Sequence, residues 1–383
     1  MSKLRYLIDW RRLPARTAIL GKALKNPPHG PQIIQIEHTR RCNLKCVMCA
    51  HGASCPPESI PDLTLDEFKA CVDGPHALGH LKAVHIQGLG EPFLHKDFPA
   101  MVRHANRLGL DTATISNMTV MNGRLAEEII TGGLNLLSVS LDSPDSPYMA
   151  ALRRGASFDV LERMIANLRL IRRKQAEMHS ATPEIIVYAI VMRDTLPQLP
   201  ALKALLQDLG IRVLNLENLL ASGVSSEALL PNGARVIDQP LGLLSPAALE
   251  QAVAAMAALN DDTFTVQLPD VFEGHPRTGR PQEGIYTCLD LWNQPAIGAN
   301  GIVTPCCFTV GGTSLVMGDI RRQSFRDIWH GKAYNQLRRA HLLGSAPEIC
   351  RKCPHYSRLV RPWKDCEAAP QSNRYQAFFL DHL

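Results

Sequence analysis

Short apolar runs alternate with amphipathic stretches along most of this 383-residue chain. Apolar runs predict buried strands, and apolar residues that recur every three or four positions predict helices. The expected strands cover residues 33–37, 83–87, 112–115, 136–141, 185–191 and 213–216. The expected helices cover residues 64–72, 97–108, 123–131, 158–173 and 199–209. Thr64 and Glu67 have the spacing of a capping box at the start of the first of these helices.

Regular alternation of strand and helix argues for an α/β fold with a parallel sheet, closed or partly closed as a barrel. Six strands are fewer than the eight of a full barrel. We therefore expect a partial (β/α)6 TIM-like barrel. In barrels of this kind, active-site residues lie at the carboxyl ends of the strands.

The pattern also predicts how the chain is divided into domains. The expected segments are a basic helical extension at residues 1–30, the barrel at 31–220, a linker with one helix at 221–285, a small cysteine-containing domain at 286–367 and a tail at 368–383. Within the linker, residues 247–259 form an alanine-rich helix, and residues 273–284 are rich in turn residues. This second stretch could close over a substrate.

Composition and charge exclude several classes of function. The net charge of +5 comes from scattered Lys and Arg without a basic stripe, so nucleic-acid binding has little support. No apolar run is long enough to span a bilayer. Asp9, Arg11 and Arg12 interrupt the amino-terminal stretch, which therefore lacks the apolar segment of a signal peptide. Eleven cysteines without an export signal indicate metal or catalytic use in a reducing, cytoplasmic environment.

Three of these cysteines, Cys42, Cys46 and Cys49, have the spacing Cys-x3-Cys-x2-Cys directly after the first expected strand. A four-iron cluster normally takes one cysteine thiolate per iron, so three thiolates leave one iron open to another molecule. A structural zinc ion is the alternative, and it would need a fourth ligand such as His38 or His51. An open iron indicates chemistry rather than electron storage alone.

This spacing resembles that of the radical S-adenosylmethionine (radical SAM) superfamily. In that family, the open iron binds the amino and carboxylate groups of S-adenosylmethionine. Reductive cleavage then gives methionine and a 5'-deoxyadenosyl radical, which abstracts a hydrogen atom from the substrate. The resemblance implies a 4Fe-4S cluster and S-adenosylmethionine as cofactors, an open six-unit barrel as the fold, and a flavodoxin- or ferredoxin-type electron donor.

Glycine and glutamate follow the second expected strand, in Gly88-Leu89-Gly90-Glu91. Glycines at this place let the backbone approach a ligand closely and adopt a positive φ. The stretch resembles the family's Gly-Gly-Glu motif for the methionine amino group, with Leu89 where the family usually has a glycine. A plain glycine turn is the alternative explanation.

Short polar side chains end the next two strands, at Ser116-Asn117 and at Ser140 to Asp142. Such side chains suit hydroxyl and carboxylate groups of a ligand. By resemblance, Ser140 and Asp142 would address the ribose and the carboxylate of S-adenosylmethionine. Each of these residues could instead cap a helix.

Further contacts to S-adenosylmethionine are implied by the same resemblance. Arg153 or Arg154 would make a charge-assisted contact to its carboxylate, and the sequence does not separate the two arginines. Val191 and Met192, at the end of the fifth strand, would offer backbone contacts to adenine.

Three residues near the barrel mouth are candidate bases, without a ranking among them: His51, Tyr188 and Glu217.

A second set of cysteines begins at residue 288. With a short hairpin at 301–306, a turn at 318–320 and a helix near 325–330, it resembles the SPASM or twitch extension of radical SAM enzymes. The resemblance implies one auxiliary 4Fe-4S cluster, held by Cys288, Cys306, Cys350 and Cys353. Cys307 could replace Cys306, and zinc is the competing metal because four thiolates also close a tetrahedral site.

Four cysteines remain after these seven expected ligands: Cys55, Cys71, Cys307 and Cys366. Cys71 lies within an expected helix and reads as a small buried hydrophobic residue. The other three could face the substrate and return a hydrogen atom to it.

The reaction is the least constrained part of the sequence analysis. Only 41 residues precede Cys42, too few for a leader-recognition domain, so we expect a small polar substrate such as a sugar or an aminocyclitol. Alcohol oxidation and epimerisation both remain open. The alternatives are a peptide-modifying enzyme with a separately encoded recognition protein, and an iron–sulfur redox scaffold without turnover.

Overall fold

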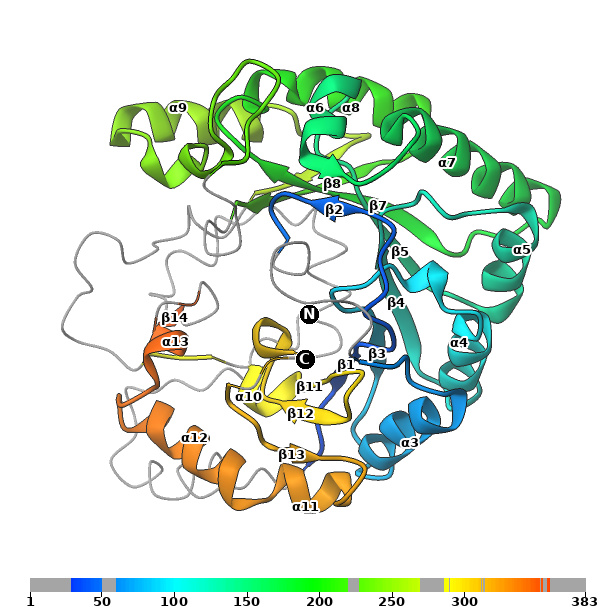
Figure 1. Cartoon of the computed structure of the whole chain (residues 1–383), viewed down its shortest axis with the longest axis vertical. Coiled ribbons are helices and arrows are strands. Elements are labelled where there is room, and N and C mark those ends of the chain that lie inside the picture. Colours follow the sequence, from blue (N-terminus) through cyan, green and yellow to red (C-terminus); the bar gives the residue numbers. More distant parts are fainter. Residues whose placement is uncertain are drawn as a thin grey trace. The chain divides into compact units, whose positions relative to one another are not determined.

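A computed structural model describes residues 29–49, 60–219, 227–268, 286–288, 290–310, 312, 314–351, 353 and 357–358. The chain forms two compact units (Figure 1). We call Glu37–Lys69 with Val84–Gly274 the central unit, and Met1–Ile36, Ala70–Ala83 and His275–Leu383 the terminal unit. Each unit is described by itself.

A parallel sheet forms the centre of the central unit. Its strands are β3 (Ala83–Ile86), β4 (Asp111–Ser116), β5 (Leu136–Ser140), β7 (Glu184–Val191), β8 (Val213–Asn218) and β9 (Thr265–Gln267), in the order β3-β4-β5-β7-β8-β9. Each pair of neighbours from β4 to β9 is parallel. The strands expected at 83–87, 112–115, 136–141, 185–191 and 213–216 are therefore all present.

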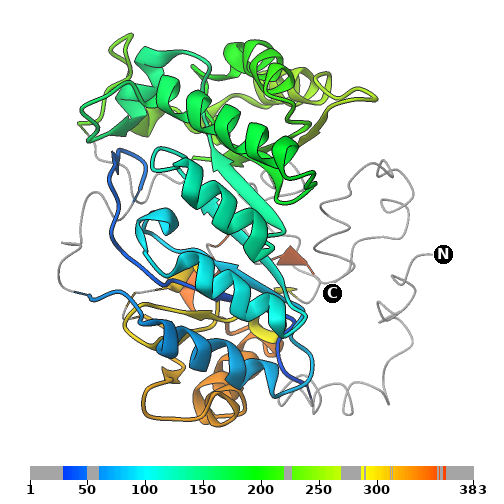
Figure 2. The same cartoon turned by 90° about the vertical axis from the view of Figure 1, so that its right-hand side faces the viewer.

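Helices connect these strands and cover one face of the sheet (Figure 1). They are α3 (Leu65–His76), α4 (Phe98–Arg107), α5 (Gly123–Gly132), α6 (Ser146–Leu152), α7 (Val160–Glu177), α8 (Leu199–Asp208) and α9 (Pro246–Ala257), with 3-10 turns at Pro92–Leu94, Leu196–Gln198, Val236–Asp238 and Leu241–Leu243. Helix α4 packs on α5, and α5 and α6 pack on α7. Figure 2 shows the cyan to green helices side by side. The strand and helix alternation predicted from the sequence is confirmed.

Local sequence signals start the helices where they were expected. The Thr64 amide donates to Glu67 Oε2 at 2.9 Å and the Glu67 amide to Thr64 Oγ1 at 3.2 Å, which is the predicted capping box. Asn122 caps α5 through a bond from the Leu125 amide at 2.9 Å. Gly133, with φ 81°, ends the same helix in the left-handed region.

The structure adds elements that the sequence did not predict. The strand at 213–216 is not the last of the sheet, because β9 pairs parallel to β8 inside the expected linker. With only three residues, β9 is too short to show a pattern of its own. Helix α6 has seven residues and begins at Ser146, directly after its N-cap Asp145, whose side chain accepts from the Tyr148 amide.

The terminal unit contains four consecutive strands of mixed direction. They are β1 (Ile33–Ile36), β11 (Ala296–Ile297), β12 (Ile302–Thr304) and β13 (Gly318–Asp319), in the order β13-β12-β11-β1. β1 is parallel to β11, while β11, β12 and β13 are antiparallel to their neighbours. A hairpin was expected at 301–306; the structure has one earlier in the chain, formed by β11 and β12, with Gly301 at φ 78° in its turn.

Short helices pack beside these strands: α10 (Asp290–Asn293), α11 (Phe325–Trp329), α12 (Lys332–Leu342) and α13 (Glu348–Arg351), with a 3-10 turn at Cys307–Thr309 and a two-stranded ladder of β10 (Tyr286–Thr287) and β14 (Ser357–Arg358). Helix α11 was expected and α12 was not. Cys71, in α3, is 1% exposed, so its expected burial is confirmed. No helix in the described ranges has the length and apolar character needed to cross a membrane.

Candidate functional site

The first cysteine loop is fixed by a short ladder in the central unit. Strand β2 (Lys45–Cys46) pairs antiparallel with β6 (Arg153–Arg154), which places Cys46 opposite Arg153. The ladder continues in a hydrogen bond from the Val47 amide to the Leu152 carbonyl at 2.9 Å. The Cys49 amide closes a turn onto the Cys46 carbonyl at 3.2 Å. The loop is thus tied to a segment more than 100 residues away.

Apolar packing anchors the same loop. Val47 and Met48 pack against a buried cluster of residues from α6, the end of β7 and the segment after β8: Leu152, Met192, Leu219, Ala228, Leu230 and Val236. The two residues between Cys46 and Cys49 therefore hold the loop in place while the thiols on either side remain partly exposed. The sequence analysis missed this role because it read the loop only for its cysteines.

The thiols of this loop fit an iron–sulfur cluster. Burial raises the pKa of Cys42 to about 11 and also raises the pKa of Cys46, and the thiols repel one another when ionised. Because metal ligands of this type must be thiolates, these side chains ionise at neutral pH only with a cationic partner, and binding of that partner releases their protons. Three neighbouring thiols without a disulfide supply such ligands.

Two side chains lie at the edge of hydrogen-bonding distance from these sulfurs. Asn117 Nδ2 is 3.9 Å from Cys42 Sγ, and Arg153 Nη1 is 3.9 Å from Cys46 Sγ. Hydrogen bonds to cluster sulfurs are one of the means by which a protein tunes an iron–sulfur site. Asn117 and Arg153 were both expected near the cofactor.

A buried ion pair orients Arg153. Its Nε and Nη2 atoms lie 2.9 and 2.8 Å from Asp142 Oδ2, and Asp142 Oδ1 accepts from the Ile190 amide at 2.9 Å. Asp142 therefore faces Arg153 and the backbone of β7, so the expected contact between Asp142 and a ligand carboxylate is not what the structure supports. Arg154 is exposed and bonds to backbone carbonyls. Of the two arginines, the structure brings Arg153 to the cysteines.

Glu91 connects the glycine motif to the end of β4. The side chain is 2% exposed and accepts from Ser116 Oγ and the Asn117 amide, both at 2.7 Å, and from the Phe93 amide at 3.2 Å. Burial raises the pKa of Glu91 to about 7. A carboxylate has about four acceptor sites, so roughly one remains for a ligand ammonium group.

Gly88 and Gly90 are required for a reason other than the expected one. Neither has a positive φ, so that expectation is wrong. A Cβ at Gly88 would lie 2.4 Å from Glu37 Cγ, and one at Gly90 would lie 2.5 Å from the Thr39 carbonyl oxygen. The segment before the first cysteine packs directly on the motif, and the Glu91 amide donates to the Arg41 carbonyl at 2.8 Å.

A polar network beside Cys42 contains residues that the sequence analysis missed. Asn117 Nδ2 donates to Asn43 Oδ1 at 3.0 Å, and Asn43 Nδ2 donates to Thr119 Oγ1 at 2.8 Å. Thr119 Oγ1 in turn donates to Asn117 Oδ1 at 2.6 Å. Met118, between them, has φ 55°, a conformation that bulky residues rarely adopt and that clusters at functional sites. The run of polar residues after β4 was the available signal.

A row of polar residues crosses four neighbouring strands of the sheet, from β5 to β9. Register places Ser140 beside Tyr188, Tyr188 beside Asn215, and Asn215 beside Gln267. Ser140, Tyr188 and Gln267 are partly exposed. Burial raises the pKa of Tyr188 to about 12, with Asn215 as a hydrogen-bonding neighbour. Tyr188 therefore stays protonated at neutral pH and does not suit the role of base; Glu217, two positions beyond Asn215, is exposed.

The backbone of Met192 is already engaged. Its amide donates to Thr195 Oγ1 at 3.0 Å, and its carbonyl accepts from the Thr195 and Leu196 amides at 3.2 and 2.9 Å. Its side chain is fully buried. The geometry therefore does not support the expected adenine contact from Met192.

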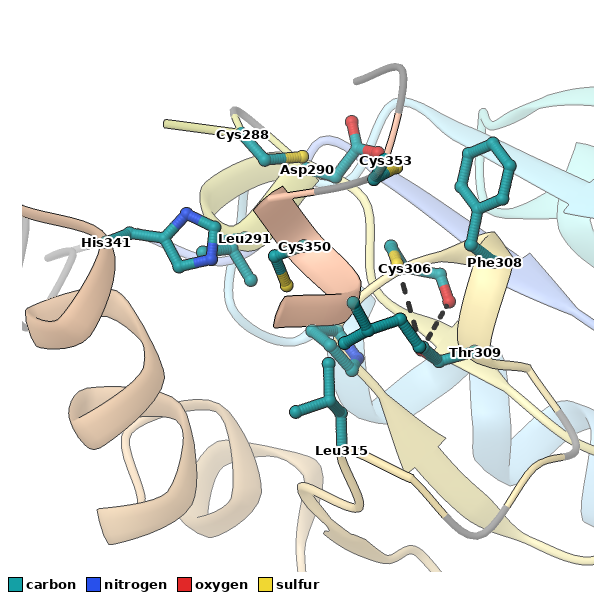
Figure 3. Close-up of a pocket in the computed structure, with 12 residues that line it drawn as sticks. Cys288, Asp290, Leu291, Cys306, Phe308, Thr309, Leu315, His341, Cys350 and Cys353 are labelled. Atoms are coloured by element: carbon teal, nitrogen blue, oxygen red, sulfur yellow. Dashed lines mark hydrogen bonds between the residues drawn. The ribbon is translucent and has the colours of Figure 1, made fainter. Parts of the chain in front are cut away.

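The second set of cysteines lines one pocket of the terminal unit (Figure 3). Its lining consists of Cys288, Asp290, Leu291, Pro305, Cys306, Phe308, Thr309, Leu315, His341, Ile349, Cys350 and Cys353. The four cysteines expected to bind an auxiliary cluster thus come together from three segments of the chain. Cys307 is not among the described residues that line this pocket, which favours Cys306 over Cys307.

The chemistry of this pocket fits a cluster bound by thiolates. Burial raises the pKa values of Cys288 and Cys306, and raises that of Cys350 to about 11. The described residues contain no group of three or more His, Cys, Asp or Glu side chains arranged for one metal ion. A four-iron cluster does not need such convergence, because each iron takes its own thiolate. Cys306 Sγ also lies 3.7 Å from Thr309 Oγ1.

Other candidates lie elsewhere. Cys55, Cys366 and His51 fall outside the described residues. His38 Nε2 lies 3.4 Å from the Pro92 carbonyl, and its ring packs against Phe98, so it has a structural role. His341 lines the auxiliary pocket with a pKa that burial lowers to about 4, and the sequence analysis missed it because helix α12 was not predicted.

Comparison with known families identifies two matching domains. Residues 36–179 match the radical SAM superfamily, and residues 288–354 match SPASM, an iron–sulfur cluster-binding domain. These two domains imply S-adenosylmethionine, the radical SAM 4Fe-4S cluster and an auxiliary cluster as cofactors.

Two of the curated relatives align with most of this chain, and a third aligns with about half of it. A PqqA peptide cyclase of Granulibacter bethesdensis is 24% identical over 360 residues, 92% of this chain and 84% of that protein. An AdoMet-dependent heme synthase of Methanosarcina barkeri is 24% identical, over 84% of this chain and 89% of that protein. A tungsten-containing aldehyde ferredoxin oxidoreductase cofactor-modifying protein of Pyrococcus furiosus is 27% identical over 191 residues, and the chain covers only about half, 51%, of that relative.

Solved structures show the same fold. Streptococcus suis SuiB, bound to its precursor peptide SuiA, superposes with a TM-score of 0.64 at 16% identity, over 90% of this chain and 78% of that chain. At this identity the likeness concerns the fold alone.

Gly90 tests the packing beneath the glycine motif. Gly90→Ala should lower the free energy of unfolding by about 1–3 kcal/mol, because the added methyl group meets backbone atoms that cannot move aside. Gly123→Ala is the matched control, since its nearest neighbour would be Lys174 Cε at 3.9 Å, and we expect a neutral or slightly stabilising effect there. Urea unfolding under anaerobic conditions measures both. Equal effects at the two positions would contradict the packing argument.

Arg153 and Arg154 are adjacent but should differ sharply. Arg153→Met leaves the Asp142 carboxylate buried without its partner and should cost about 3–5 kcal/mol of stability. Arg154→Met should cost less than about 0.5 kcal/mol, as an exposed position. Asp142→Asn in the Arg153→Met background should restore part of the loss. Similar unfolding midpoints for the two single variants would show that the ion pair does not have this role.

Proposed function

We propose that this chain is a radical SAM enzyme that modifies a peptide substrate. It belongs to the radical SAM superfamily and carries a SPASM domain. The observation that carries the peptide substrate is the alignment with a PqqA peptide cyclase over 92% of this chain and 84% of that protein. Further PqqA peptide cyclases align over 84–88% of the chain. The small polar substrate expected from the sequence is less well supported.

We assign the radical SAM cluster to Cys42, Cys46 and Cys49, and the auxiliary cluster to Cys288, Cys306, Cys350 and Cys353. When bound, these clusters and S-adenosylmethionine supply the reducing electron, the 5'-deoxyadenosyl radical and an acceptor for the second electron. The expected external donor is of the flavodoxin or ferredoxin type.

Residues of the central unit orient the cofactor. Glu91 keeps Ser116 and the Asn117 amide in place and has an acceptor site left for the ammonium group of S-adenosylmethionine. Arg153, positioned by Asp142, provides a fixed cation beside Cys46. Ser140, at the end of β5, remains the candidate for the ribose.

The polar row across β5, β7, β8 and β9 suits a peptide. Peptide backbones present both amide donors and carbonyl acceptors. Tyr188 stays protonated and can donate to a carbonyl.

Two fates of the substrate radical remain possible. Cross-linking or oxidation removes two hydrogen atoms: one goes to the deoxyadenosyl carbon, and the other leaves as a proton and an electron. Epimerisation instead needs a hydrogen atom returned by a thiol, for which Cys55, Cys307 and Cys366 are the candidates. Burial raises the pKa of Cys307, so it would carry its hydrogen at neutral pH.

The experiment follows the hydrogen atom. The anaerobically reconstituted enzyme is given S-adenosylmethionine, a strong reductant and one of three substrate sets deuterated at carbon: a peptide pool from the native host, sugars with aminocyclitols, or porphyrins. Mass spectrometry measures deuterium in 5'-deoxyadenosine. We expect transfer from the peptide pool, none with the Cys49→Ala variant, and a peptide that has lost two hydrogen atoms if cross-linking or oxidation is the outcome.

Each other result points to another class. Deuterium transfer only from sugars and aminocyclitols would indicate that the enzyme oxidises or epimerises such small molecules. Deuterium transfer only from porphyrins would indicate a function like that of the heme synthase relative. No 5'-deoxyadenosine from any set, with both clusters intact, would indicate a redox scaffold.

A further inference from the structure

An arginine of helix α12 is buried in the terminal unit and has no acidic partner among the residues that the structure describes. Arg338 is 0% exposed. Its guanidinium carbon lies 4.3 Å from the ring centroid of Trp329 and 4.5 Å from that of Tyr334, so the cation contacts two aromatic faces. Such contacts offset part of the cost of removing the charge from water.

The remaining contacts of Arg338 are to neutral groups. Its Nε atom donates to the Leu291 carbonyl at 3.1 Å, and Nη1 donates to the Trp329 carbonyl at 2.8 Å. Nη2 is buried and has no hydrogen-bond partner within the described ranges. Burial lowers the pKa of Arg338 to about 10, so the side chain is still cationic at neutral pH.

The charged and titratable neighbours do not neutralise this cation. Tyr334 is a buried phenol whose pKa burial raises, so it is neutral. His330 lies close enough for the Arg338 charge to lower its pKa, after the larger effect of burial. None of the ion pairs found among the described residues involves Arg338. A buried charge is normally paired or bound to a metal site, because its desolvation is otherwise uncompensated.

The auxiliary pocket lies directly beyond these contacts. Leu291, which accepts from Arg338, lines the pocket, and Tyr334 is close enough to Cys306 for a thiolate there to raise its pKa. Tyr334 also donates to the Thr304 carbonyl at 3.3 Å, two residues before Cys306. Cys288, Cys306, Cys350 and Cys353 line the same pocket as Leu291, and Asp290 belongs to that lining too.

We propose that Arg338 is the buried counter-charge of the auxiliary cluster and raises its reduction potential. The fixed cation stabilises the more negative, reduced form of the cluster, because net charge around the irons is one of the terms that sets the potential. Arg338 acts on the cluster through the electrostatic effect of its charge and does not contact the substrate. This role concerns electron acceptance and does not depend on the identity of the substrate.

The test is an anaerobic redox titration followed by electron paramagnetic resonance. The full chain is used with Cys42→Ala, Cys46→Ala and Cys49→Ala, so that only the auxiliary cluster contributes. Arg338→Met should make the reduction potential of the auxiliary cluster at least about 59 mV more negative. For a one-electron couple, this is a tenfold shift of the equilibrium toward the oxidised form. Arg338→Lys, which keeps the charge but loses the flat guanidinium, should shift it less.

Two further variants separate charge from packing. Arg339→Met, on the same helix but exposed, is the matched control and should leave the potential unchanged. If Arg338→Met does not retain iron, Arg338→Gln carries the test, because its amide can still donate to a backbone carbonyl. An unchanged potential in the neutral variant that retains the cluster, or an equal shift in Arg338→Lys and Arg338→Met, would overturn the proposal.

Discussion

The two-residue ladder between β2 and β6 is the contact on which the site of the central unit depends. It places Cys46 opposite Arg153 and joins the cysteine loop to the segment after α6. Since Arg153 is paired with the buried Asp142 at 2.8 Å, its guanidinium has one orientation, toward the Cys46 sulfur. Without this ladder, the cysteines would have the right spacing along the chain but no fixed direction in space.

Burial of ionisable groups is the theme that both units share. Burial shifts the pKa values of Glu91, Cys42, Cys288 and Arg338, in each case in the direction that favours the neutral form. The ionised form of a buried group is stabilised when a group of opposite charge lies beside it. A cluster held by thiolates is negative. Arg153 lies 3.9 Å from Cys46 Sγ, and Arg338 donates to the carbonyl of Leu291, which lines the auxiliary pocket.

The sequence predicted the strand and helix alternation because those patterns are local. Thr64 with Glu67, and the apolar runs of β4 to β8, carry their signal within a few residues. Contacts between segments that are distant along the chain could not be predicted from the sequence. The sequence could not separate Arg153 from Arg154, because only the pairing with β2 decides which one is buried. It assigned Gly90 to a ligand, whereas the backbone at Thr39 occupies the space.

The sequence also did not identify the substrate: we expected a small polar molecule, whereas peptide cyclases are among the relatives. Residues that hold the cysteines, such as Val47 and Asn43, have no pattern that separates them from ordinary loop residues. The α12 residues that face the auxiliary pocket belong to a helix that was not expected. Long-range packing, rather than local propensity, decides all of these positions.

The central claim, two clusters in one chain, is tested most directly by iron and acid-labile sulfide per chain after anaerobic reconstitution. The native protein is compared with a variant in which Cys42, Cys46 and Cys49 are replaced by Ala. We expect about eight irons in the native protein and about four in the variant, as two four-iron clusters require. A native value near four that falls to zero would contradict the auxiliary cluster and the role proposed for Arg338.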